Sequence, residues 1–421
     1  MGIPDVSGRA VILPRIVARH VEDAALLAHQ RRALVLAPHV RLHHLRRHDD
    51  RLAAHLDGVS VAGPAGLAMC EAALAEPGYG EMFCATAAAL AADAPRALYK
   101  LLALSEAVPA LAPGMAEALG WVSAQYLRAT IRELLVSVSP CRRALAIAAC
   151  ALHQVDPGAA LAQAVDAADV PLRACALRVA GECGRTDLVG RCLDALADDD
   201  AGCRFWAARS LLFLGQTERA MAVLDGFASE AAPLRADALA LLLKHGAAAA
   251  VEAALHGLAA DPNRLRLLVQ GTGIAGDPYC VPWLIRQMHD AATARCAGEA
   301  FALITGLDLA WLDLDRPPPP DVQAEEPQDD AATGSDADLP WPDPVRINEW
   351  WQANQHRFQP GTRYFMGQPP TPDHCRAVLR DGYQRQRIAA AEYLCLLAPG
   401  SRLFPTAAPA WRQSRWLARM G

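Results

Sequence analysis

Apolar residues in the middle of the chain recur at intervals of three and four, and short polar or glycine-containing breaks interrupt this pattern. In the segment from Val170 to Gly184, the apolar positions are Leu172, Cys175, Ala176, Val179, Ala180 and Cys183. Residues at this spacing form a stripe along one face of an α-helix. A second stripe follows in residues 187–198, so the pattern predicts two helices joined by a short turn.

This helix pair is repeated with an almost constant period. Arginines at the start of the first helix recur 31 residues apart, with one shorter interval, at Arg142, Arg173, Arg204, Arg235, Arg264 and Arg295. A glycine follows 11 residues after most of them, and 12 after Arg264, at Gly184, Gly215, Gly246, Gly276 and Gly306. Glycine suits the position after a helix because it accepts a positive φ.

Six such repeats fit between Pro140 and Leu309. One helix pair cannot bury its apolar stripes alone, whereas stacked pairs can. The period, the arginine at the start of the first helix and the glycine at its end resemble HEAT-like repeats of the short bacterial kind. The resemblance implies an all-α, right-handed HEAT-like α-solenoid, with the arginine-bearing helices on its concave side.

The repeated arginines have two interpretations. Acids stand just upstream, where they can cap the following helix, at Asp169, Asp200, Glu230 and Asp290. One interpretation is that the arginines form a ladder of hydrogen bonds to these acids between repeats. The alternative is that they bind a ligand on the concave face, which makes Arg173, Arg204 and Arg235 candidate partner-binding residues.

The pattern divides the chain into five parts. Residues 1–62 are expected to form an N-terminal helical cap, and residues 63–139 a set of irregular HEAT-like helices. The regular repeats occupy residues 140–310. Residues 316–340 contain four consecutive prolines and seven acids, a composition that favours a disordered or loosely ordered linker. Residues 341–421 are expected to form an aromatic-rich helical C-terminal cap.

Composition excludes several classes of protein. The chain is 53% hydrophobic, mostly through alanine and leucine, which favour helices. Its net charge of -6 lacks the basic footprint of a general nucleic-acid-binding protein. We find neither a signal-peptide pattern nor an apolar segment long enough to span a membrane. The 12 cysteines form no Cys-x-x-Cys motif and are expected to be small buried side chains in a reducing cytoplasm.

Residues that could carry catalysis or bind metal are sparse. The pairs His39/His43 and His44/His48 have the spacing that can place two metal ligands on one helix face. The two pairs point to different faces, so we expect a solvated polar face and no metal site. The sequence contains no Walker A motif, no Gly-x-Ser-x-Gly motif and no His-Glu pair of the kind found in deoxyhypusine hydroxylases. We therefore expect no cofactor and no enzymatic activity.

Aromatic residues concentrate in the segment "LPWPDPVRINEWWQANQHRFQPGTRYFMGQP". Trp350 and Trp351 are adjacent, so a helix cannot direct both into one core. One interpretation is that one packs on the repeats and the other covers a neighbouring segment. The other is that this region anchors a partner, because Trp and Tyr dominate binding hot spots. The candidate anchors are Trp350, Trp351, Tyr364 and Phe365.

A more specific resemblance rests on four segments. They are "QRRALVLAPHVRLHHLRRHDDRLAAHLDGVSVAG", "AFALITGLDL", "DLPWPDPVRINEWW" and "RFQPGTRYFMGQP". Together they resemble an uncharacterised bacterial HEAT-repeat family whose genes often lie in type VI secretion effector neighbourhoods, beside spike, adaptor and toxin genes. The resemblance implies a cytoplasmic, non-enzymatic scaffold or accessory protein whose partner is an effector, adaptor or spike component of that system.

Two other functions stay open. A HEAT-like nucleic-acid-binding or DNA-repair protein would need a contiguous strip of positive potential on the concave face. An unrecognised enzyme on the same scaffold would need a deep pocket with clustered titrating residues.

Overall fold

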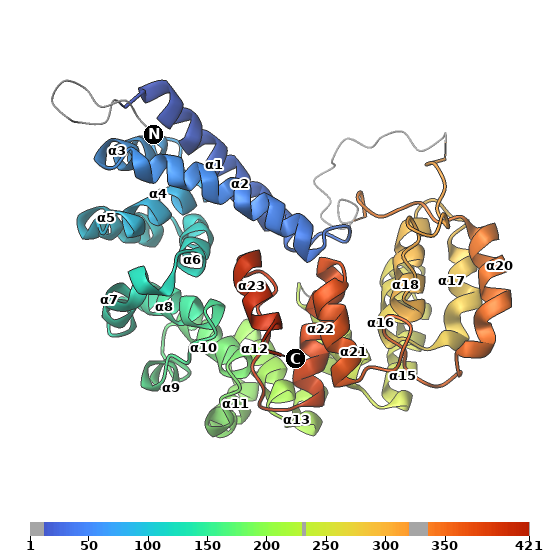
Figure 1. Ribbon diagram of the computed structural model, residues 1–421. Helices are drawn as coiled ribbons and strands as arrows, with labels where there is room; N and C mark the ends of the chain where they lie inside the picture. Colours follow the sequence, from blue (N-terminus) through green and yellow to red (C-terminus); the bar gives the residue numbers. More distant parts are fainter. Residues whose placement is uncertain (1–11, 230–232, 320–335, 421) are drawn as a thin grey trace. The chain divides into compact units, whose positions relative to one another are not determined.

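The computed structural model of the chain describes residues 12–229, 233–319 and 336–420. Throughout these residues the chain forms helices joined by turns, and they contain no β-strand. The prediction of an all-α fold is therefore confirmed. None of the helices within these ranges is both long and apolar enough to cross a membrane. The helices group into two compact units, which we describe separately (Figure 1).

Unit 1 comprises residues 12–36, 40–183 and 404–420, so it joins the N-terminal helices to the last segment of the chain. Its helices are α1 (Pro14–Leu34), α2 (Leu42–Val61), α3 (Pro64–Ala73), α4 (Tyr79–Ala91), α5 (Pro95–Ala107), η1 (Pro109–Leu111), α6 (Ala112–Trp121), α7 (Ala124–Leu135), α8 (Pro140–Leu152), α9 (Ala159–Ala164), α10 (Val170–Glu182) and α23 (Ala410–Leu417). Helix α4 packs against α1, α2, α3, α5 and α6. Its buried residues, including Met82 and Phe83, therefore form the centre of the core.

Unit 2 comprises residues 37–39 and the described part of 184–403. Its helices are η2 (Thr186–Leu188), α11 (Val189–Asp194), η3 (Ala195–Ala197), α12 (Ala201–Phe213), α13 (Thr217–Ser229), α14 (Arg235–His245), α15 (Ala248–Ala259), η4 (Pro262–Arg264), α16 (Leu265–Ala275), η5 (Pro278–Cys280), α17 (Val281–Gln287), α18 (Ala294–Thr305), α20 (Pro344–Asn354), η6 (Gln355–Arg357), α21 (Pro372–Asp381) and α22 (Gln384–Leu397). Helix α13 packs against α12 and α14, and α16 packs against α14 and α18. Helix pairs that are adjacent in sequence are thus stacked on one another.

Two of the repeated helices begin at the acids that the sequence predicts, whereas α18 begins after Thr293, which has no side-chain cap, and not at Asp290. Asp169 accepts the backbone N–H of Leu172 at 2.9 Å, and Asp200 accepts that of Cys203 at 2.8 Å. Both acids therefore cap a helix. Glu230 lies outside the described residues. Four of the glycines at the helix ends have positive φ: Gly184, Gly215, Gly276 and Gly306. Gly246 differs, with φ -59° and ψ 150°.

The two units do not follow the predicted domain boundaries. They divide between Cys183 and Gly184, inside the predicted regular repeats of residues 140–310. The predicted C-terminal cap is also divided, because residues 341–403 pack within unit 2 and residues 404–420 pack within unit 1. Successive parts of this segment thus pack within different units.

The described ends of the predicted linker are packed. The backbone N–H of Arg316 donates to the carbonyl of Trp341 at 2.8 Å. Asp336 is buried and lies 2.5 Å from Arg266, and Leu339 is also buried. Residues 336–340 therefore belong to the folded part of unit 2. Residues 320–335, which hold most of the linker acids, lie outside the described residues.

Candidate functional site

The aromatic residues predicted to anchor a partner pack within unit 2. Trp351, Tyr364 and Phe365 keep only 4%, 9% and 4% of their surface exposed. The ring centroids of Trp350 and Trp351 lie 6.4 Å and 5.4 Å from that of Phe358, and the Tyr364 ring lies 5.1 Å from it. Rings with so little exposed surface pack in the core, as the first interpretation expects, and they offer a partner protein little area to cover. Half-buried Trp350 belongs to the same cluster.

The repeated arginines hold the turns between helices together. Arg173 donates to the carbonyl of Ala167 at 2.6 Å, and Arg204 donates to that of Asp198 at 2.7 Å. Arg235 lies 3.4 Å from the carbonyl of Ser229. Each of these carbonyls lies at or just after the end of the preceding helix, where backbone acceptors lack helical partners. The described bonds therefore give these three predicted partner-binding residues a structural role.

Two short segments far along the chain cap the carboxyl ends of α12, α14, α16 and α18. We call residues 363–367 and 399–400 the strap. The Arg363 side chain donates to the carbonyls of Lys244 and Gly246, at 2.6 and 3.1 Å. The other bonds of the strap join its backbone N–H groups to carbonyls at the helix ends: Tyr364 to Gly276 (2.8 Å), Met366 to Leu303 (2.6 Å), Gly367 to Ile304 (3.0 Å) and Gly400 to Phe213 (2.8 Å). These helix ends are thus satisfied by residues that no repeat contains.

The strap explains two of the repeat glycines. A Cβ at Gly276 would lie 2.2 Å from the carbonyl oxygen of Tyr364, and one at Gly184 would lie 2.1 Å from that of Gly400. Both glycines also have positive φ, at 77° and 67°. Glycine is therefore required there for the turn and for the close approach of the strap backbone.

Helix α22 lies against the arginine-bearing helices of unit 2 and is held by charge. Glu392 lies 2.5 Å from Lys244 of α14 and 3.6 Å from Arg209 of α12. Arg385 pairs with Glu299 of α18 at 2.9 Å. Burial raises the pKa of Glu392, but the charges of Lys244 and Arg209 lower it by more, so the pKa lies below its usual value. The Glu392 carboxylate is therefore a charged contact between α22 and this face.

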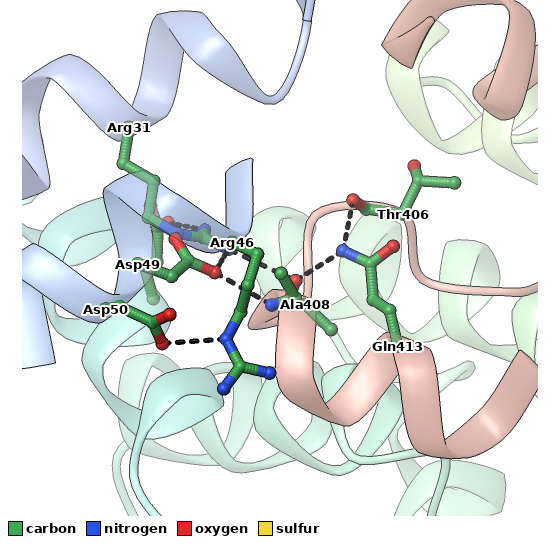
Figure 2. A network of polar contacts seen from close by, with 9 residues as sticks. Arg31, Arg46, Asp49, Asp50, Thr406, Ala408 and Gln413 are labelled. Carbon is green, nitrogen blue, oxygen red and sulfur yellow. Dashed lines mark hydrogen bonds and ion pairs between the residues drawn. The ribbon is translucent and has the colours of Figure 1, made fainter. Parts of the chain in front are cut away.

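A buried polar network holds the end of the chain within unit 1 (Figure 2). Arg31 of α1 donates to Asp49 of α2 at 2.8 Å, to Glu117 of α6 at 2.6 Å and to the carbonyl of Ala408 at 3.1 Å. Asp49 in turn accepts the backbone N–H of Ala410 at 2.7 Å. The start of α23 is therefore tied to α1 and α2 by charged, buried hydrogen bonds.

Unit 1 also contains a cavity of about 540 Å³. Its walls come from α2, α4, the end of α6, the start of α7, His153 just after α8, and α23 with the residues that follow it. Trp121 and Trp411 form part of its apolar lining, and Arg412, Arg415 and Arg419 form its basic side. An apolar hollow with a few converging polar groups is the usual form of a small-molecule site.

The early histidines do not gather into a site. His43 and His44 are exposed, with ring centroids 4.0 Å apart. His48 is buried, contrary to the expected solvated face, and burial lowers its pKa. Within residues 12–229, 233–319 and 336–420, no group of three or more His, Cys, Asp or Glu side chains is arranged to hold a metal ion.

The sequence pattern does not single out Glu392, Arg415 of α23 or Arg419 just after that helix. Arg415 and Arg419 have i, i+4 spacing beside Trp411 and Trp416, but such a pattern also describes an ordinary amphipathic helix end. Glu392 has no local signal, because its partners lie more than a hundred residues earlier in the chain.

A scan against protein-family models and a search of curated proteins both found no match, so the candidate surfaces rest on the chain's own geometry.

Proposed function

We propose that this protein is a HEAT-like α-solenoid that acts as a non-enzymatic scaffold for another protein in the bacterial cytoplasm. The stacked helix pairs of unit 2 support the repeat architecture. The four sequence segments that resemble a family from type VI secretion loci support the choice of partner. That partner is an effector, adaptor or spike component of a type VI secretion system, and the scaffold uses no cofactor.

One observation carries the binding function. The arginine-bearing helices α12, α14 and α18 hold α22 through charged side chains, although α22 lies far from them in sequence. This face therefore has the groups needed to recognise a helical segment with an acid at the position of Glu392. A partner helix with such an acid would replace α22 in the same contacts, which is recognition of a helix in a groove.

The first experiment asks whether a secretion component binds. The protein is purified by affinity from its native host, and the bound proteins are identified by mass spectrometry. We expect an effector, adaptor or spike protein encoded near the gene. If no secretion component co-purifies and deletion of the gene leaves effector delivery unchanged, the proposal is wrong.

A charge-reversed variant tests the face itself. The triple substitution Arg209→Glu, Lys244→Glu and Glu392→Lys keeps opposite charges between α22 and its helices, so α22 should stay in place. An acidic partner segment would meet two carboxylates and be repelled. We expect the triple variant to lose the partner while its circular dichroism spectrum stays unchanged. Undiminished capture would show that the partner binds elsewhere.

A further inference from the structure

The cavity in unit 1 is separate from the α22 face, and its shape follows from small side chains. Ala87, Ala88 and Ala91 of α4 are among its lining residues. Protein interiors are usually packed to the density of organic crystals, with few voids larger than a water molecule. A hollow of about 540 Å³ lies within the range of small-molecule pockets, which is roughly 300–1,000 Å³.

Aromatic rings form the apolar side of the cavity. The rings of Trp121 and Trp411 meet edge to face, with centroids 4.7 Å apart and an interplanar angle of 82°. The Phe83 ring packs edge to face against Trp121, with centroids 5.8 Å apart. Such rings present a large, rigid surface to an apolar ligand at little entropic cost.

Hydrogen bonds within the protein hold the α23 wall of the cavity in place without a ligand. The guanidinium of Arg412 donates to the carbonyls of Gly120, Trp121 and Val122 at 2.5, 3.1 and 3.2 Å. These carbonyls end α6, so Arg412 joins α23 to the helix that carries Trp121. A preformed site avoids much of the ordering cost of binding.

The same wall of the cavity carries positive charge. Arg415 and Arg419 are exposed, and neither guanidinium has an ion pair or hydrogen bond within the described part of the chain. Asp57 is the only acid among the lining residues, all of which the structure describes. Burial, and then the charges of Arg415 and Arg31, lower the pKa of Arg412 to about 10. The local field therefore favours an anion.

We propose that this cavity binds a small organic anion. Its aromatic or branched aliphatic body packs on Trp121 and Trp411, and its carboxylate, sulfonate or phosphate group pairs with Arg415 and Arg419. The ligand's negative charge offsets the mutual repulsion of the arginines, and its body fills the space that the alanines of α4 leave. The inference does not rest on the proposed protein partner, because every lining residue lies in unit 1.

Two dyes of the same shape test the inference. One is 8-anilino-1-naphthalenesulfonate, and the other is N-phenyl-1-naphthylamine, which has the same aromatic body without the sulfonate. We expect Arg415→Ala with Arg419→Ala to weaken binding of the sulfonate dye about tenfold and to change binding of the neutral dye less than about twofold. The matched control is Arg376→Ala with Arg380→Ala, which has the same spacing on α21 of unit 2 and should change neither.

A blocking variant locates the dyes. Ala91→Trp places an indole in the cavity and should abolish binding of both dyes, with the circular dichroism spectrum unchanged. If the Arg415→Ala, Arg419→Ala variant binds the sulfonate dye as tightly as the wild type, the cavity does not select anions and the proposal is wrong. If Ala91→Trp binds both dyes undiminished, the dyes do not occupy the cavity, and the proposal is equally wrong.

Discussion

At the residue scale, the two Arg–Asp pairs of Figure 2 show how burial determines what an ion pair contributes. Their shortest N–O distances are nearly equal, 2.8 Å for Arg31–Asp49 and 2.7 Å for Arg46–Asp50. The side chains of the first pair are 1% and 0% exposed, whereas those of the second are 47% and 54% exposed. Water can replace a lost partner only in the second pair.

Asp49→Asn should therefore destabilise unit 1 by roughly 1.5–3 kcal/mol, because Arg31 loses a buried, charge-assisted hydrogen bond although it keeps its pair with Glu117. Asp50→Asn is the matched control and should change the free energy of unfolding by less than about 1 kcal/mol. Urea denaturation followed by tryptophan fluorescence measures both. Similar losses in the two variants would contradict this account.

Two substitutions distinguish a glycine that a left-handed turn requires from a glycine that lies inside a helix. Gly276→Ala should destabilise unit 2 by at least about 2 kcal/mol, because the new Cβ meets the Tyr364 carbonyl in a left-handed turn. Gly257→Ala, inside α15 with open space around its Cα, should stabilise by about 0.5–1 kcal/mol. Thermal denaturation of the two variants should therefore give melting temperatures on opposite sides of the wild-type value.

At the element scale, Glu392 makes the docking of α22 depend on pH. The pKa of this carboxyl is lower in the folded protein than in the unfolded chain, where it is near 4.5. As the pH falls, the unfolded chain therefore takes up the proton before the folded protein does. The stabilisation that the Glu392 charge contributes is complete above the pKa of the unfolded chain, and it is lost as the pH falls through the pKa of the folded protein. Glu392→Gln should cost roughly 1.5–3 kcal/mol at neutral pH, the usual contribution of a hydrogen bond to a charged group.

Denaturation of the wild type and of Glu392→Gln over a range of pH checks this expectation. The difference between their unfolding free energies should be constant near neutrality and should shrink as the solution is made acidic. A difference that does not change with pH would show that the Glu392 charge does not hold α22.

The sequence predicts the helices of the repeats well because their signals are local. Asp169 and Asp200 cap helices within three residues of themselves, and Gly215 and Gly306 end helices with positive φ. The aromatic segment was less predictable. Its composition suits a binding surface as well as a core, and only the contact of Trp351 with Phe358 shows which one it forms.

At the scale of the whole molecule, the sequence does not reveal which surfaces the C-terminal segment covers. Helical periodicity shows that a face is apolar, but it does not name the partner of that face. The contacts of Tyr364 with Gly276 and of Arg412 with Gly120 join residues 88 and 292 positions apart. The division of residues 341–421 between two units and the cavity beside α23 follow from such contacts, so neither could be predicted.

Removal of residues 404–421 tests this division. The truncated chain loses the bonds of Arg412 to α6 and of Ala410 to Asp49, together with one wall of the cavity. Unit 1 should then open locally more often, because buried acceptors at the end of α6 and the Asp49 carboxylate lose partners. Hydrogen exchange should become faster in α2 and α6, while α16 and α18 of unit 2 serve as the internal control and keep their protection. Equal acceleration in both units would mean that the last segment stabilises the chain as a whole, and that the two units do not unfold separately.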